Sequence, residues 1–173
     1  RDNETNKIKN IYFSVLKKIE KKKNKQINLI GVKAEAGIGK SRLIVEFLNL
    51  NREIRNNNFF CIAHSTNISS KPYYLFISMI KDIFSISEID SLSIFKNKIE
   101  KGIEKLISQN KDKEVELKQA LPFLGFLIGI KYQDSRFEDK NELQNHIHLS
   151  LRILLESICK RANHQGLSYI FIL

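Results

Sequence analysis

Hydrophobic and polar positions follow a helical period over most of this chain. Near the N-terminus, apolar residues recur three or four positions apart, at Ile8, Ile11, Tyr12, Val15, Leu16 and Ile19. The same spacing returns in four later segments, at residues 72–84, 87–106, 116–130 and 141–163. This period places the apolar side chains on one face of an α-helix. The sequence therefore predicts a helix-rich chain with an amphipathic helix in each of these segments.

Several helix ends are marked by residues with particular backbone preferences. Pro72 suits the first position of a helix, and Ser87 suits an N-cap. Pro122 is expected to break the helix at 116–130, because proline lacks the N–H group that a helix interior needs. Gly129 is expected to end it.

Three apolar runs have no helical period and are of strand length. They are Ile27–Val32, Phe59–Ala63 and Leu167–Leu173. Continuous apolar runs are typical of parallel strands that are buried on both faces of a sheet. The order of elements is β-α-β, then a helical block, then β. It predicts an incomplete α/β three-layer sandwich, with parallel strands and a large helical insertion before the last strand.

A glycine-rich segment lies between the first apolar run and an amphipathic helix. It reads Ala34-Glu35-Ala36-Gly37-Ile38-Gly39-Lys40-Ser41. A strand, a glycine-rich loop, Lys-Ser and a helix are the context of a phosphate-binding P-loop. The glycines let backbone N–H groups approach phosphate oxygens, and the helix directs its positive end at the same anion. Alanine at position 34, where glycine is usual, tolerates the negative φ of that position.

The loop predicts a site for ATP and Mg²⁺. The candidate ligand-binding residues are Ala34, Glu35, Ala36, Gly37, Ile38, Gly39, Lys40, Ser41 and Arg42. Lys40 is the candidate catalytic residue, because its ammonium can reach the β- and γ-phosphates. Ser41 can supply a hydroxyl ligand for Mg²⁺. No guanine-reading motif is visible, so the choice between ATP and GTP stays open.

Composition and charge narrow the possible partners. The chain has 173 residues, 42% of them hydrophobic, which suits one folded domain. Its net charge is +10, but the densest lysine run, at 17–25, lies at the C-terminal end of a predicted helix, where cations complement the helix dipole. This run has no interleaved aromatic residues that could stack on bases. Nucleic acid is therefore not the expected partner. The longest apolar run, Leu121–Ile130, is too short to cross a bilayer.

Cysteine and histidine spacing gives no metal motif. Cys61 and Cys159 lack CxxC spacing and fit buried free thiols in a reducing cytoplasm, which is the expected location. His146 and His148 lie two positions apart on a predicted helix, so they are expected to point to different faces.

The loop resembles that of a known family. Glu35–Leu43, followed by Glu46-Phe47, resembles the P-loop of AAA-type (STAND-like) signalling ATPases. Weaker similarities in the same order are Arg1-Asp2-Asn3-Glu4, Pro72-Tyr73-Tyr74, Leu121-Pro122-Phe123-Leu124 and Tyr169–Leu173. Domains of this family occur in large regulators, joined to class III adenylate or guanylate cyclase, kinase or DNA-binding activator domains.

The resemblance implies a specific organisation and function. Residues 1–173 are expected to be the N-terminal part of one P-loop ATPase domain, ending just before the acidic residues of the Walker B strand. The implied function is an ATP-binding and ATP-hydrolysing regulatory domain, with output and helical-repeat domains of the same chain as partners. This segment alone is not expected to turn over ATP. Two alternatives stay open: a nucleotide-binding switch or scaffold without turnover, and a basic nucleic-acid-binding module.

Overall fold

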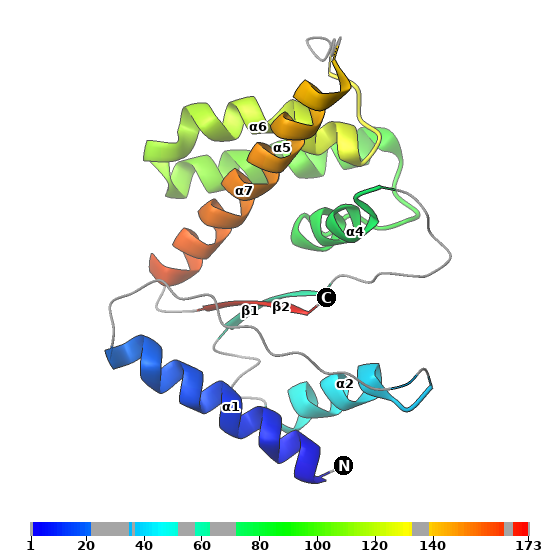
Figure 1. Ribbon diagram of the computed structural model, residues 1–173. Helices are drawn as coiled ribbons and strands as arrows, with labels where there is room; N and C mark the ends of the chain where they lie inside the picture. Colours follow the sequence, from blue (N-terminus) through cyan, green and yellow to red (C-terminus); the bar gives the residue numbers. More distant parts are fainter. Residues whose placement is uncertain are drawn as a thin grey trace. The chain divides into compact units, whose positions relative to one another are not determined.

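The computed structural model describes residues 2–21, 35, 37–51, 58–62, 72–132, 139–164 and 168–172. The chain divides into two compact units, Arg1–Asn56 and Asn57–Leu173. The first unit holds helices α1 (Asp2–Lys21) and α2 (Lys40–Leu50), which contact each other (Figure 1). α1 confirms the helix predicted from the N-terminal apolar spacing. The strand expected at Ile27–Val32 lies outside the described residues.

The second unit is built mainly from helices. They are α4 (Tyr74–Ile83), α5 (Leu92–Gln109), the short 3-10 helix η1 (Lys111–Lys113), α6 (Glu114–Leu127) and α7 (Lys140–His164). Helices α5, α6 and α7 pack on one another, with α7 crossing the other two (Figure 1). The four helical segments predicted in this region are therefore confirmed, with shifted ends.

The core of the second unit lies among these helices. Ile99 and Ile103 of α5, Leu117 and Leu124 of α6, and Leu154 of α7 are all buried in one cluster. Each helix contributes residues at the spacing that the sequence shows, so the amphipathic faces bury one another. Leu92 is 61% exposed, because it is the first residue of α5 and lies at the end of the helix.

Two strands complete the second unit. β1 (Asn58–Ile62) and β2 (Ser168–Ile172) pair in parallel, in a register that runs from Asn58 opposite Ser168 to Ile62 opposite Ile172. α4 contacts β1 and α7 contacts β2. Cys61 of β1 is fully buried and lies in a small cluster with Met79 of α4.

The expected α/β three-layer sandwich is wrong. The described residues are predominantly helical, and their sheet has only the two strands β1 and β2. A three-layer sandwich needs a wide parallel sheet whose two faces bury the helices. Here the helices of the second unit bury their apolar faces on one another instead. The helical block, which lies in sequence between β1 and β2, therefore has a core of its own.

Three predicted helix ends differ from the structure and one is confirmed. Ser91, not Ser87, is the N-cap of α5, and its hydroxyl accepts from the Ile94 N–H at 3.4 Å. Pro72 precedes α4 in a turn, and Pro122 lies inside α6 without ending it. Gly129 follows α6 with φ of 88°, the left-handed conformation that commonly closes a helix.

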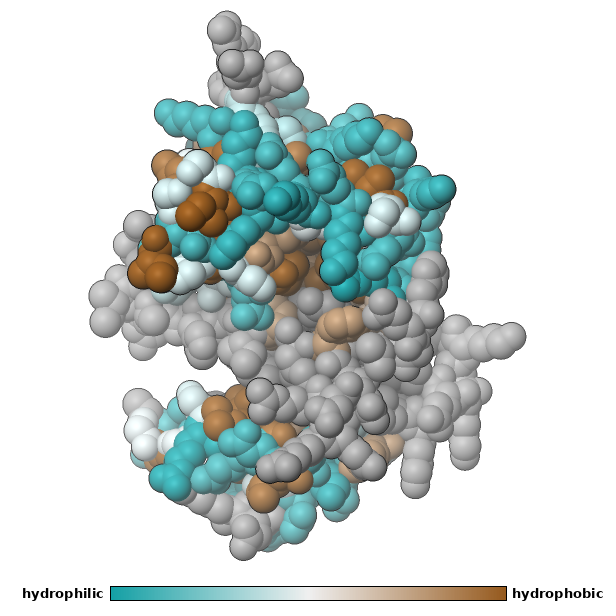
Figure 2. Space-filling model, turned by 180° about the vertical axis from the view of Figure 1, so that it is seen from behind, coloured by the Kyte–Doolittle hydropathy of each residue, from teal (hydrophilic) through white to brown (hydrophobic). Residues whose placement is uncertain are grey.

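The described surface is mostly hydrophilic on the face that Figure 2 shows, with hydrophobic side chains in separate small groups. Within the described residues, no helix combines the length and apolar character needed to cross a membrane.

Candidate functional site

The glycine-rich loop places two residues in the left-handed region. Gly37 has φ of 81° and Gly39 has φ of 94°. Glycine adopts this conformation without the Cβ clash that other residues incur. A Cβ added at Gly37 would meet no atom within 4 Å, so the requirement there concerns backbone conformation and not space. The two glycines turn the chain sharply into α2.

The start of α2 is electropositive. Gly39 is its N-cap, and the Gly39 carbonyl accepts the first helical hydrogen bond from the Leu43 N–H at 2.9 Å. There is no side-chain cap hydrogen bond and no acidic residue in the first turn. The N–H groups of a first helical turn carry a partial positive charge, and an anion is the favourable partner for it.

Lys40 folds back over the loop. Its Nζ donates to the Glu35 carbonyl oxygen at 2.7 Å, so the side chain spans the loop from the helix start to the point where the chain enters. The contact fixes the ammonium at the start of the loop. An ammonium has three N–H donors and bonds well to phosphate oxygens.

The remaining candidate residues take different positions. Ser41 is exposed in the first turn of α2, and Ile38 is exposed in the loop. The Arg42 Nε donates to Glu46 Oε1 at 2.8 Å along α2, so Arg42 supports the helix by an (i, i+4) ion pair. Ala34 and Ala36 lie outside the described residues.

The two helical histidines point to different neighbours. The His146 ring stacks on Phe123 of α6, with ring centroids 4.6 Å apart. His148 Nε2 lies 3.2 Å from the hydroxyl of Tyr73, the residue that precedes α4. Across the described residues, no three His, Cys, Asp or Glu side chains gather into a possible metal site.

Both cysteines are free thiols. Burial, with a smaller contribution from the Asp82 carboxylate, raises the pKa of Cys61 to about 12. Burial also raises the pKa of Cys159. Both thiols stay protonated near neutral pH, and a protonated thiol is a poor nucleophile.

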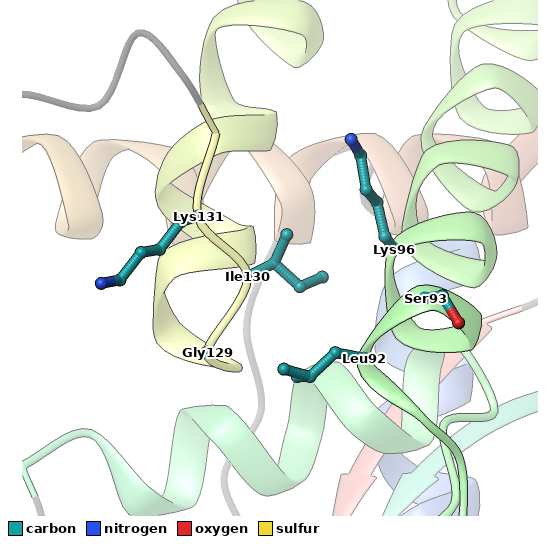
Figure 3. A pocket seen from close by; sticks show the side chains of 6 residues that line it. All are labelled: Leu92, Ser93, Lys96, Gly129, Ile130 and Lys131. Carbon is teal, nitrogen blue, oxygen red and sulfur yellow. The ribbon is translucent and has the colours of Figure 1, made fainter.

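A shallow hollow of about 430 Å³ lies where the start of α5 meets the turn after α6. Figure 3 shows the side chains of Leu92 and Ile130 turned toward this space, whereas Lys96 and Lys131 point away from it in different directions. The Lys96 ammonium lies 5.3 Å from the centre of the Tyr132 ring. A ligand site needs a few convergent polar groups, and this hollow does not provide them.

Comparisons with protein-family models, curated proteins and solved structures find no match to this chain. The resemblance to AAA-type signalling ATPases is therefore wrong as an assignment of family. The predominantly helical structure of the described residues agrees with this correction, because that family requires a central parallel sheet. A short glycine-rich motif specifies a local conformation, and that conformation does not by itself identify a family.

Proposed function

We propose that residues 35–42 bind the phosphates of a nucleotide, with ATP and Mg²⁺ as the ligand. The observation that carries the proposal is the conformation of the loop and the start of α2. Two glycines with positive φ lead into a helix whose first turn contains Lys40 and Arg42 and no acidic residue.

Electrostatics favours an anion at this position. Cations near a helix N-terminus oppose the helix dipole, at about 0.3–1 kcal/mol each. Lys40 and Arg42 both lie in the first turn of α2, and Arg42 is paired with Glu46. A bound phosphate reverses the sign of these interactions, because it lies at the positive end of the helix and beside the ammonium.

The proposed roles follow from position. Backbone N–H groups at the start of α2 contact the phosphates, and Lys40 adds a charge-assisted contact from its place over the loop. Ser41 is the proposed ligand for Mg²⁺. Its hydroxyl lies in the first turn, one residue after Lys40, and is exposed. ATP is abundant in the cytoplasm, which is the proposed location.

Hydrolysis is the second part of the proposal. Lys40 would stabilise negative charge on the γ-phosphate during in-line attack by water. Glu35 is the proposed residue to orient that water, because its side chain is exposed in the loop, whereas the Glu46 carboxylate is paired with Arg42. A nucleotide-dependent change at Lys40 would affect both the loop and α2, which suits a regulatory domain.

Calorimetry with Mg-ATP tests the binding site. Lys40→Ala is expected to weaken binding about ten- to hundredfold, because one charge-assisted contact contributes about 1.5–3 kcal/mol. Lys101→Ala is the matched control, since it removes the same charge from an exposed position of α5. Equal affinity in Lys40→Ala and the unaltered chain would contradict the proposal. Titration with Mg-GTP in parallel determines the base preference.

Phosphate release from the same samples tests turnover. We expect slow or absent release by residues 1–173. Release that is lost in both Lys40→Ala and Glu35→Gln would assign hydrolysis to this loop. Tight binding without release would instead support a nucleotide-binding switch.

A further inference from the structure

We propose that a basic pocket in the second unit binds a small oxyanion, either a phosphate or a carboxylate group. The pocket has a volume of about 190 Å³ and lies where the end of α4, the middle of α5 and the end of α7 meet. Its polar lining includes the cations Lys98, Lys105 and Arg161. The pocket is separate from the loop at 35–42, because all its residues belong to the other compact unit.

One of the three cations is already compensated. The Lys98 Nζ donates to Asp90 Oδ2 and to the Ser85 carbonyl oxygen, both at 2.6 Å. Lys105 and Arg161 form no ion pair with any carboxylate in the part of the chain that the structure describes. The pocket therefore carries two positive charges that its described surroundings do not neutralise.

Arg161 provides more specific evidence for a bound anion than Lys105 does. Its Nε is buried and has no hydrogen-bond partner among the described residues. Its guanidinium carbon lies 5.4 Å from the centre of the Phe59 ring, a cation–π contact that helps to fix the orientation of the guanidinium. A buried donor without an acceptor is unfavourable, and buried donors in native proteins are normally paired. The missing acceptor suggests a ligand.

The chemistry of the acceptor follows from the guanidinium. Arginine binds phosphate and carboxylate through two parallel N–H···O bonds, and Nε commonly provides one of them. Lys105 supplies a second positive charge on the pocket lining. The other walls include the apolar residues Phe84, Leu106 and Ile158, which exclude water from one side of the pocket and strengthen the contacts with the anion. The size of the pocket suits one phosphate or carboxylate group on a small molecule.

Binding of inorganic phosphate and of acetate tests the proposal. Calorimetry and thermal unfolding are performed on the full chain with Lys40→Ala as background, so that the glycine-rich loop does not contribute. In this background, Arg161→Gln and Lys105→Gln are each expected to weaken anion binding by about ten- to hundredfold. Arg152→Gln is the matched control, because Arg152 lies on α7, is 76% exposed and pairs with Glu156.

Each outcome has a definite meaning. Saturable binding of phosphate or acetate that requires Arg161 and Lys105 and is unaffected by Arg152→Gln supports the site, and the stronger anion defines the ligand class. Equal losses in all three variants would indicate a general charge effect and overturn the proposal, as would unaltered binding in Arg161→Gln and Lys105→Gln. Lys105 is exposed, so Lys105→Gln keeps the test valid if Arg161→Gln fails to fold. Loss of ATP binding in Lys40→Ala with phosphate binding retained separates this site from the proposed nucleotide site.

Discussion

Gly102→Ala tests the packing of α5 against Phe84. Gly102 lies inside α5, and a Cβ added there would be 2.3 Å from Phe84 Cδ1 and 2.5 Å from Phe84 Cε1. Alanine in a helix interior is favoured over glycine by about 0.8–1.0 kcal/mol. Phe84 is only 8% exposed and belongs to the main hydrophobic cluster, so its ring cannot leave without disturbing that cluster.

Overpacking of this kind costs about 1–3 kcal/mol, which exceeds the gain in helix propensity. We therefore expect Gly102→Ala to lower the free energy of unfolding by up to about 2 kcal/mol. The free energy is measured by urea denaturation, followed by circular dichroism at 222 nm, a wavelength commonly used for helix content. Asn97→Ala, at an exposed position of α5, reports the effect of propensity alone.

A double-mutant cycle isolates the clash. Phe84→Ala removes both Cδ1 and Cε1, so Gly102→Ala in that background should become stabilising by about 0.8–1.0 kcal/mol. The coupling energy between the two changes is then about 1–3 kcal/mol. If Gly102→Ala stabilises the chain equally in both backgrounds, the Phe84 ring does not occupy the space beside Gly102 and the argument is refuted.

Two further predictions concern the loop and an ion pair. Gly37→Val is expected to weaken Mg-ATP binding more than Gly37→Asn, because asparagine tolerates the positive φ of this position and a β-branched residue does not. Calorimetry measures both affinities, and equal affinities of the two variants would contradict a conformational role for Gly37. The Lys98 ammonium, with the Ser87 N–H, lowers the pKa of Asp90 below its ordinary 3.8. A lowered folded-state pKa adds stability that is complete above the ordinary pKa and is lost as pH falls through the lowered value. Asp90→Asn should therefore make the free energy of unfolding less dependent on pH in the acid range, which urea denaturation at a series of pH values measures.

The positions of the helices could be predicted because their apolar spacing is strong. Ile99, Ile103 and Leu106 mark the buried face of α5 in the sequence, and the structure buries all three. The start of α5 could not be predicted as well, because Ser87 and Ser91 are equally suitable caps by residue type. The structure selects Ser91, whose hydroxyl accepts from the Ile94 N–H.

The wider architecture could not be derived in the same way. An apolar run such as Phe59–Ala63 indicates a buried strand, but it does not indicate how many strands join it. The conformation of the glycine-rich loop was easier to predict than the architecture, because positions 37 and 39 are both glycine, the residue that adopts positive φ most readily. The basic pocket was not visible in the sequence, because Arg161 meets Lys98 and Lys105 only when α7 packs near α5.

The parallel pairing of β1 with β2 has a consequence for the order of folding. β1 ends at Ile62 and β2 begins at Ser168. The intervening segment of about 105 residues must therefore close into a loop before the strands can pair. Closing a chain of that length costs about 2 kcal/mol more than closing a ten-residue loop, because the entropy loss grows with the logarithm of length. Contacts among α5, α6 and α7 are closer in sequence and shorten this loop once they form. The helical core is therefore expected to form first and the sheet last, and the amide hydrogens of β1 and β2 should exchange with solvent through a partial opening that leaves the helices protected.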